Sequence, residues 1–120
     1  MLTFSYQDVV DAPDSKAKLG NEIAFYFANQ PTPKVEKTFG IAVGRRKAKS
    51  ASDEQSCHEA MIYALTALRD RAISDGANAV IDISSYYKKK EIADKTKYEC
   101  RAGASGASVV LRGTIVKLGK

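Results

Sequence analysis

The stretch that decides the fold is residues 52–83, which read SDEQSCHEAMIYALTALRDRAISDGANAVIDI. Ser52 is a good N-cap residue, and Asp53 and Glu54 follow it in the first turn, where carboxylates complement the helix dipole. Gln55 stands at capping-box spacing from Ser52, and Gly76 suits the left-handed position that ends a helix. We therefore predict one helix from Ser52 to Gly76, of about six turns. The apolar residues that recur at steps of three and four along it are Cys57, Met61, Ala64, Leu65, Leu68 and Ala72.

Directly after this helix the hydrophobic period changes from about 3.6 to 2, which is typical of a strand. In residues 77–83 we expect Ala79, Ile81 and Ile83 to face the helix, with Asp82 and Ser84 on the far side. We predict a further strand in residues 97–101 and a last strand in residues 108–118. The last strand carries apolar residues on both faces, Val109, Leu111 and Ile115 on one and Val110, Val116 and Leu118 on the other. Such a strand is expected to be covered on both sides, and a sister subunit is one candidate for the second cover.

The residues before the helix predict three extended segments. Residues 35–46 alternate, with Val35, Lys37, Phe39, Ile41 and Val43 on one face and Gly40 and Gly44 on the other. Glycine inside a strand often marks a bulge or a close approach of another element. Residues 23–27 fit a strand that the two prolines of residues 31–33 terminate, and residues 4–10 are a candidate short strand.

The resulting fold class is α+β, with one long helix packed on an antiparallel sheet in two layers. Residues 1–120 form a single domain, in which residues 1–34 are an N-terminal extension with an extra strand and residues 35–118 are the core. A chain of 120 residues with 44% apolar and 28% charged residues has the size and composition of one globular domain.

Composition also limits the compartments and partners. The apolar runs are far shorter than the roughly 20 residues that span a bilayer, so we expect no membrane span. The N-terminal residues lack the basic and apolar regions of a signal peptide, so the protein is either cytoplasmic or a leader has been removed. The net charge of +5 permits an anionic partner without establishing one.

No pattern in the sequence predicts an enzyme active site. Gly40, Gly44 and Lys49-Ser50 do not form a phosphate-binding loop, because no glycine precedes Lys49 and the interval is wrong. His58 is adjacent to Cys57, and neighbouring helix positions point about 100° apart, which argues against a catalytic pair. A zinc site from Cys57, His58, Glu99 and Cys100 would match no known ligand spacing. We therefore expect no catalytic residues, no metal and no cofactor.

Two groups of residues remain as candidates for binding. The first is a set of cations that could contact an anion: Arg45, Arg46, Lys47, Lys49, Lys88, Lys89 and Lys90. The second is Tyr86 and Tyr87, which interleave aromatic rings with these cations as single-strand nucleic-acid platforms do. A solvated strand end is the alternative interpretation of both, and it is the commoner one.

Cys57 and Cys100 allow two interpretations. Cys57 begins the core stripe of the helix and Cys100 lies in a strand of the sheet, so an oxidising compartment would permit a disulfide between them. In a reducing compartment the same positions would hold two buried thiols.

Several segments resemble known bacterial proteins. Residues 68–72 and 75–83 resemble the junction between helix and Gly-Ala-[Asp/Asn]-Ala-Val strand of the YbjQ-like proteins, and residues 113–117 resemble their closing strand. RcsF-like envelope domains share the Ala-Asn-Ala-Val junction. Small exported proteins often labelled "excinuclease ATPase subunit" are similar at residues 52–54, 57, 82–83, 85–89, 98–100 and 102–103. The label does not suit this chain, which lacks a nucleotide loop.

This resemblance implies a dodecin-like β-α-β-β core, export to the periplasm and a Cys57–Cys100 disulfide, and it implies that a homo-oligomer can form. We therefore expect a non-catalytic module of the bacterial cell envelope that binds an unidentified protein partner or small ligand. The alternative is a basic cytoplasmic protein that binds nucleic acid.

Overall fold

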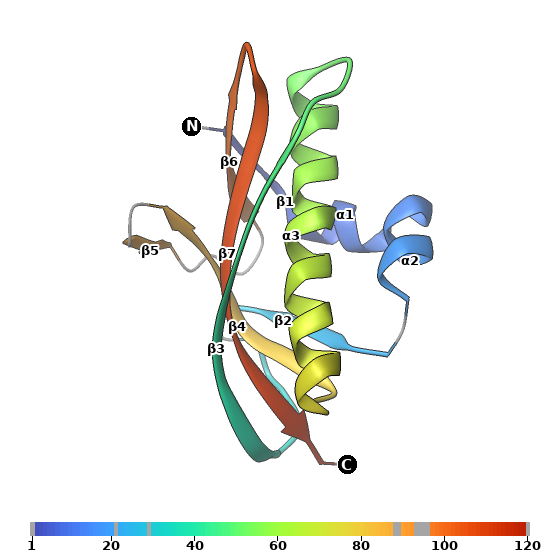
Figure 1. Cartoon of the computed structure of the whole chain (residues 1–120), viewed down its shortest axis with the longest axis vertical. Helices are drawn as coiled ribbons and strands as arrows, with labels where there is room; N and C mark the ends of the chain where they lie inside the picture. The colour runs from blue at the N-terminus through green and yellow to red at the C-terminus, as the bar shows by residue number, and fades with distance from the viewer. Residues whose placement is uncertain (1, 21, 29, 88–89, 93–96, 120) are drawn as a thin grey trace.

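The computed structural model describes residues 2–20, 22–28, 30–87, 90–92 and 97–119 (Figure 1). Its helices are α1 (Tyr6–Asp11), α2 (Pro13–Leu19) and α3 (Asp53–Asp75). Its strands are β1 (Leu2–Ser5), β2 (Ala24–Phe27), β3 (Val35–Ala48), β4 (Ala79–Tyr87), β5 (Lys90–Ile92), β6 (Lys97–Gly103) and β7 (Gly106–Leu118). The α+β class is confirmed: one long helix, α3, packs on a mixed, mostly antiparallel sheet.

The ends of α3 lie where the sequence predicts them. The backbone N–H of Gln55 donates to Ser52 Oγ at 3.1 Å, which satisfies one of the free donors of the first turn. Gly76 has a φ of 78°, a left-handed conformation that glycine adopts without strain. The predicted stripe from Cys57 to Ala72 is buried, and α3 covers one face of the sheet.

The sheet is built around β7. Strand β3 pairs with β7 along one edge, and β6 and β4 share the other edge, β6 beside the beginning of β7 and β4 beside its second half. Beyond these, β1 pairs with β6, while β2 and β5 pair with β4. The β2–β4 pair is parallel, which makes the sheet mixed where we predicted an antiparallel one.

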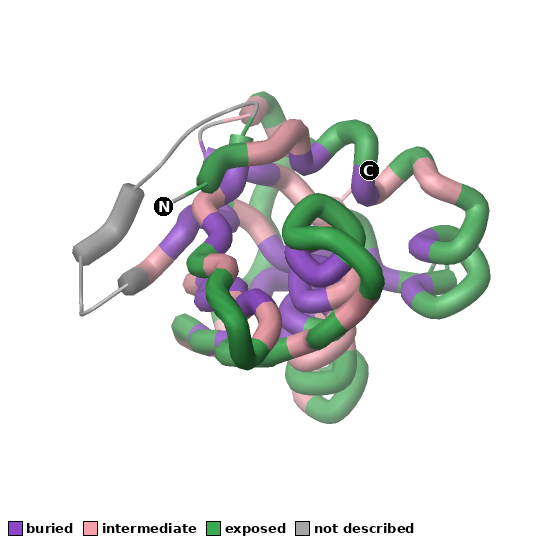
Figure 2. Tube along the Cα trace, turned by 90° about the horizontal axis from the view of Figure 1, so that it is seen from above, coloured by how far each residue is buried: buried purple, intermediate pink, exposed green. Residues whose placement is uncertain are grey.

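The two apolar faces predicted for the last strand are confirmed. Val109, Leu111 and Ile115 belong to the core beneath α3. Val116 and Leu118 form a second, smaller cluster with Ala79 on the other face. Figure 2, which looks along α3, shows buried residues concentrated around this helix. Residues of the same chain therefore bury the far side of β7 at its C-terminal end.

The predicted face of β4 is partly wrong. Ile83 faces α3, but its partner there is Val80, whereas Ala79 and Ile81 lie on the opposite face. The cause is a register shift between Ile81 and Ser84, at which Asp82 adopts a φ of 53°. An extra residue in a strand reverses the alternation beyond it.

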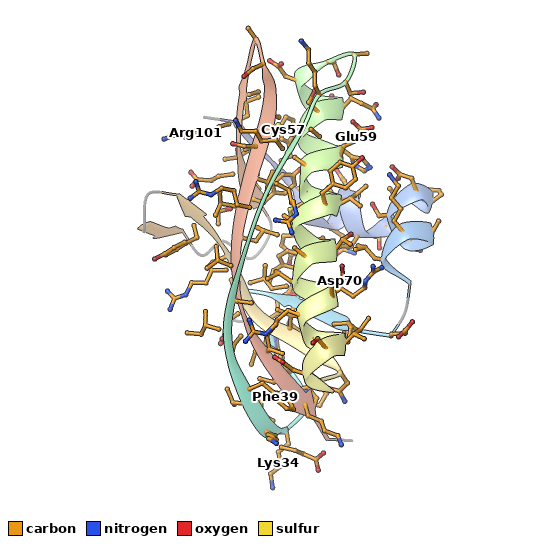
Figure 3. All side chains as sticks on the ribbon, viewed as in Figure 1. Lys34, Phe39, Cys57, Glu59, Asp70 and Arg101 are labelled. Carbon is orange, nitrogen blue, oxygen red and sulfur yellow. A yellow bond between two sulfur atoms is a disulfide. The ribbon has the colours of Figure 1, made fainter. Side chains whose placement is uncertain are left out.

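The predicted face of β3 is also wrong, for the same physical reason. A register shift between Thr38 and Gly40 turns Phe39 toward the core, as Figure 3 shows, while Ile41 and Val43 lie on the face away from α3. Gly40 lies at this shift with a φ of 139°, so of the two alternatives for a strand glycine the bulge applies here. Gly44 marks the predicted close approach, since a Cβ there would lie 2.9 Å from the Ala64 backbone oxygen.

The N-terminal extension contains two helices that the sequence analysis did not predict. The candidate strand over residues 4–10 ends at Ser5, whose side chain accepts from the Asp8 N–H and begins α1. Pro13 occupies the first turn of α2, where its missing N–H is harmless. Both helices pack on α3, and Tyr6 stacks on Phe27 with ring centroids 3.8 Å apart. The extension is thus joined to the core.

Candidate functional site

Cys57 and Cys100 form a disulfide in the structure, as expected. Cys57 lies in the first third of α3 and Cys100 in the middle of β6, with their Cα atoms 5.9 Å apart. Both side chains are fully buried, and Figure 3 shows Cys57 between the helix and the strands. The bridge fastens the N-terminal part of α3 to the branch of the sheet formed by β6 and β1.

Strand β3 lies at an edge of the sheet. This strand is 14 residues long, and among the described residues it pairs with β7 alone. From Gly40 onward its alternation is uninterrupted, so every second side chain from Ile41 to Lys47 lies on the face away from α3. We call Ile41, Val43, Arg45 and Lys47 the β3 stripe. Ile41 and Val43 are 53% and 52% exposed.

The basic half of the β3 stripe continues across the sheet. Lys47 and Arg101 are both directly opposite Ser108, one from β3 and one from β6, so all three side chains share a face. They line a hollow of about 220 Å³ at the hairpin that joins β6 to β7. Figure 3 shows Arg101 directed away from α3.

Arg112 extends this group toward the middle of the sheet, because it lies opposite Val43 on one side and Ser84 on the other. Its guanidinium lies 5.4 Å from the centroid of the Tyr86 ring, a cation–π distance. We call Arg45, Lys47, Arg101 and Arg112 the basic face. Its four cations come from three strands.

The predicted anion-binding residues divide into three groups. Arg45 and Lys47 lie together on the basic face. Arg46 points to the opposite side of the strand, and its guanidinium donates to the Arg45 carbonyl; Lys49 lies beyond the strand and donates to the Ala104 carbonyl at 3.2 Å. Lys88 and Lys89, and the side chains of Tyr87 and Lys90, lie outside the described residues.

Sequence reasoning missed Arg101 and Arg112 as members of this surface. Each stands between two uncharged neighbours in the sequence, and only the strand register brings them beside Arg45 and Lys47. The register depends on the β3–β7 and β6–β7 ladders, which no short sequence motif signals.

A second feature lies at the other face of the molecule, where α1, α2 and the start of α3 meet. His58 Nε2 lies 3.1 Å from an Asp14 carboxylate oxygen, across a separation of 44 residues. Slight desolvation raises the pKa of Asp14, but the hydrogen bond and charge of His58 outweigh it and hold the pKa below its ordinary value. A hollow of about 530 Å³ adjoins this pair, with Asp8, Glu54 and Tyr98 in its lining.

Among the described residues, neither a Cys–His nucleophile pair nor a metal site with three His, Cys, Asp or Glu ligands is formed. Cys57 is oxidised and buried, so it cannot act as a nucleophile beside His58. Within the part of the chain that the structure describes, no cluster of three or more His, Cys, Asp or Glu side chains could hold a metal ion. The basic face, by contrast, gathers four cations on one side of the sheet.

Comparison with known proteins adds no family. No protein-family model matches this chain, and the search of curated proteins finds no significant match. A separate finding concerns membranes: no helix among the described residues is both long and apolar enough to cross a bilayer.

Proposed function

We propose that this protein is a non-catalytic interaction module that binds another protein through the outer face and free edge of β3. The observation that carries the proposal is the exposure of Ile41 and Val43 on a long strand with no partner on its outer edge among the described residues. Isolated exposed apolar residues are ordinary. Here two β-branched side chains lie on an open strand edge, and the unpaired backbone N–H and C=O groups of such an edge are a template for strand pairing.

The contrast with the rest of the molecule supports this surface over others. On the side of β3 that faces α3, Ala42 and Gly44 are buried against the helix. On β7, Val110 and Val116 are buried within the chain. Ile41 and Val43 thus differ from their neighbours, and a partner strand would cover them while pairing the backbone groups of the edge.

We propose the bacterial cell envelope as the compartment. Two observations support it: the disulfide, which persists in oxidising compartments, and the resemblance to YbjQ-like and RcsF-like proteins noted above. Intact-mass measurement of protein from its host, alkylated with and without reduction, tests this. A mass lower than that of the dithiol by two hydrogen atoms, with no alkyl group added before reduction, supports the envelope. Two alkylated thiols without reduction would place the protein in a reducing compartment.

The interaction itself is tested by isolating the tagged protein from its host as wild type, as Val43→Glu and as Tyr63→Glu. Tyr63 is also a partly exposed large side chain, but it lies on α3. We expect a defined partner to accompany the wild type and Tyr63→Glu, and to be lost from Val43→Glu. Equal recovery with all three proteins would refute β3 as the binding surface.

The basic face favours a second candidate function, the binding of nucleic acid. Arg45, Lys47, Arg101 and Arg112 share one side of the sheet, and Tyr86 adds a ring beside Arg112. A gel shift with single-stranded DNA at several salt concentrations tests it, because phosphate contacts weaken steeply with salt. Absence of a shift at low salt would eliminate this candidate.

A further inference from the structure

We propose that β3 takes up an extended segment of its partner by antiparallel strand addition, and that this segment is acidic in its first half and apolar in its second. The inference rests on the proposed function and adds the chemistry of the partner. It follows from the order of side chains along the β3 stripe: two apolar residues, Ile41 and Val43, then two cations, Arg45 and Lys47.

The geometry of the edge makes strand addition feasible. Between Gly40 and Ala48 the β3–β7 ladder contains no register shift, so this part of β3 is regular and its outer backbone groups alternate in the usual way. A strand added there lies about 4.8 Å from β3, and its residues directly opposite the stripe point to the same face. Residues opposite Ile41 and Val43 therefore bury apolar surface.

Charge selects the other half of the partner. Residues opposite Arg45 and Lys47 lie beside cations. Arg101 lies on the same face of the sheet, two strands from Lys47 and across Ser108. Carboxylates at those two positions form cross-strand pairs of opposite charge, whereas lysine or arginine there would be repelled. Because an antiparallel strand runs from Lys47 toward Ile41, its order is acidic first and apolar second.

The same charges argue against a second copy of the chain as the occupant. Residues 35–48 contain four cations, Lys37, Arg45, Arg46 and Lys47, and one acid, Glu36. Parallel pairing of two β3 strands would bring the basic ends together. Antiparallel pairing would bring each basic end to Glu36 but also to Lys37, so repulsion remains in either arrangement.

The test uses a fluorescent synthetic peptide in which glutamate, threonine, glutamate, threonine, valine, threonine and valine follow one another. Its binding is measured by fluorescence anisotropy at low ionic strength against wild type, Lys47→Glu and Lys16→Glu. Lys16 is an exposed lysine of α2, so its variant has the same change in net charge at a site remote from the sheet. We expect Lys47→Glu to weaken binding about tenfold, and Lys16→Glu to leave it unchanged.

A second peptide separates strand addition from charge attraction. It is N-methylated at the alternate residues whose backbone N–H groups would face β3. N-methylation removes the backbone donors and keeps the side chains, so we expect it to abolish binding. In the complex with the unmodified peptide, amide hydrogen exchange in residues 41–47 should slow. Equal binding of the two peptides, or an equal loss in Lys16→Glu and Lys47→Glu, would overturn the proposal.

Failure of this proposal can be told apart from failure of the proposed function. If the peptide does not bind but the host partner still depends on Val43, β3 is an interaction surface for a different chemistry. If single-stranded DNA binds more tightly than the peptide, with the same dependence on Lys47, the occupant is a nucleic acid and the strand-addition proposal falls.

Discussion

Replacement of Gly44 by alanine tests the packing of β3 on α3. A Cβ at this position would lie 2.9 Å from the Ala64 backbone oxygen and 3.4 Å from the Ala67 Cβ. The first atom belongs to the helix backbone, so the contact is relieved only if the strand and the helix move apart. Overpacking of this kind costs about 1–3 kcal/mol, and the lower chain entropy of unfolded alanine offsets about 0.4–1 kcal/mol of it. We predict a net loss of about 1–2 kcal/mol in the free energy of unfolding.

The matched control is Gly103→Ala in β6. A Cβ there meets no heavy atom within 4 Å, and the backbone does not require glycine. This variant should be as stable as the wild type or more stable, by up to about 1 kcal/mol. Both variants are measured by urea unfolding followed by circular dichroism. Their stabilities are compared with that of the wild type if the slope of the free energy of unfolding against urea concentration is unchanged. If Gly44→Ala unfolds at the same urea concentration as wild type and Gly103→Ala, the close approach of β3 and α3 is incorrect.

Three further predictions concern the disulfide, the helix cap and the histidine–aspartate pair. Replacing Cys57 and Cys100 together by alanine should lower the free energy of unfolding by about 4 kcal/mol, because the bridge closes a long loop; urea unfolding measures this, and a loss under 1 kcal/mol would contradict it. Ser52→Ala should lower the free energy of unfolding by about 1 kcal/mol through loss of the bond to the Gln55 N–H, whereas no change would mean that the cap is not formed. His58→Ala should raise the pKa of Asp14 toward its ordinary value of 3.8, which a carboxyl NMR titration measures. Since the folded-state pKa is depressed, the stabilisation by this pair is present above the ordinary pKa and disappears as the pH falls through the lowered value; identical titrations of Asp14 in the two proteins would refute the pair.

The helix and the class of fold were predictable because their signals are local. The bounds of α3 follow from Ser52, the carboxylates of Asp53 and Glu54, a helical apolar stripe and Gly76. All of these signals lie within residues 52–76. The two faces of β7 were predictable for the same reason, since the strand has no bulge and its alternation reads directly from the sequence.

The faces of β3 and β4 were mispredicted because both strands contain register shifts, one in β4 and two in β3. Asp82 adopts a positive φ that is uncommon for residues other than glycine, and nothing near it in the sequence requires this conformation. A bulge at Gly40 was one of the two alternatives foreseen, but its consequence, that Phe39 and Ile41 lie on opposite faces, was not. Because alternation has a period of two, one extra residue is enough to exchange core and surface.

The candidate site was predictable only in part. Arg45 and Lys47 were singled out as cations, and the structure places both on one face. Arg101 and Arg112 join them through the register of other strands, and Asp14 meets His58 through the packing of α2, which depends on the whole fold. Such long-range juxtapositions leave no mark in any short segment.

The central claim, that the outer face of β3 is a binding surface for another protein, is tested most directly by photocrosslinking in the host. A photoreactive amino acid is placed at Val43 in one variant and, as a control, at Ile73 in another. Ile73 is similarly exposed, at 45%, but lies on α3. We predict a discrete crosslink to a second protein from position 43 and none from position 73. No crosslink from position 43, or the same crosslinks from both positions, would contradict the claim.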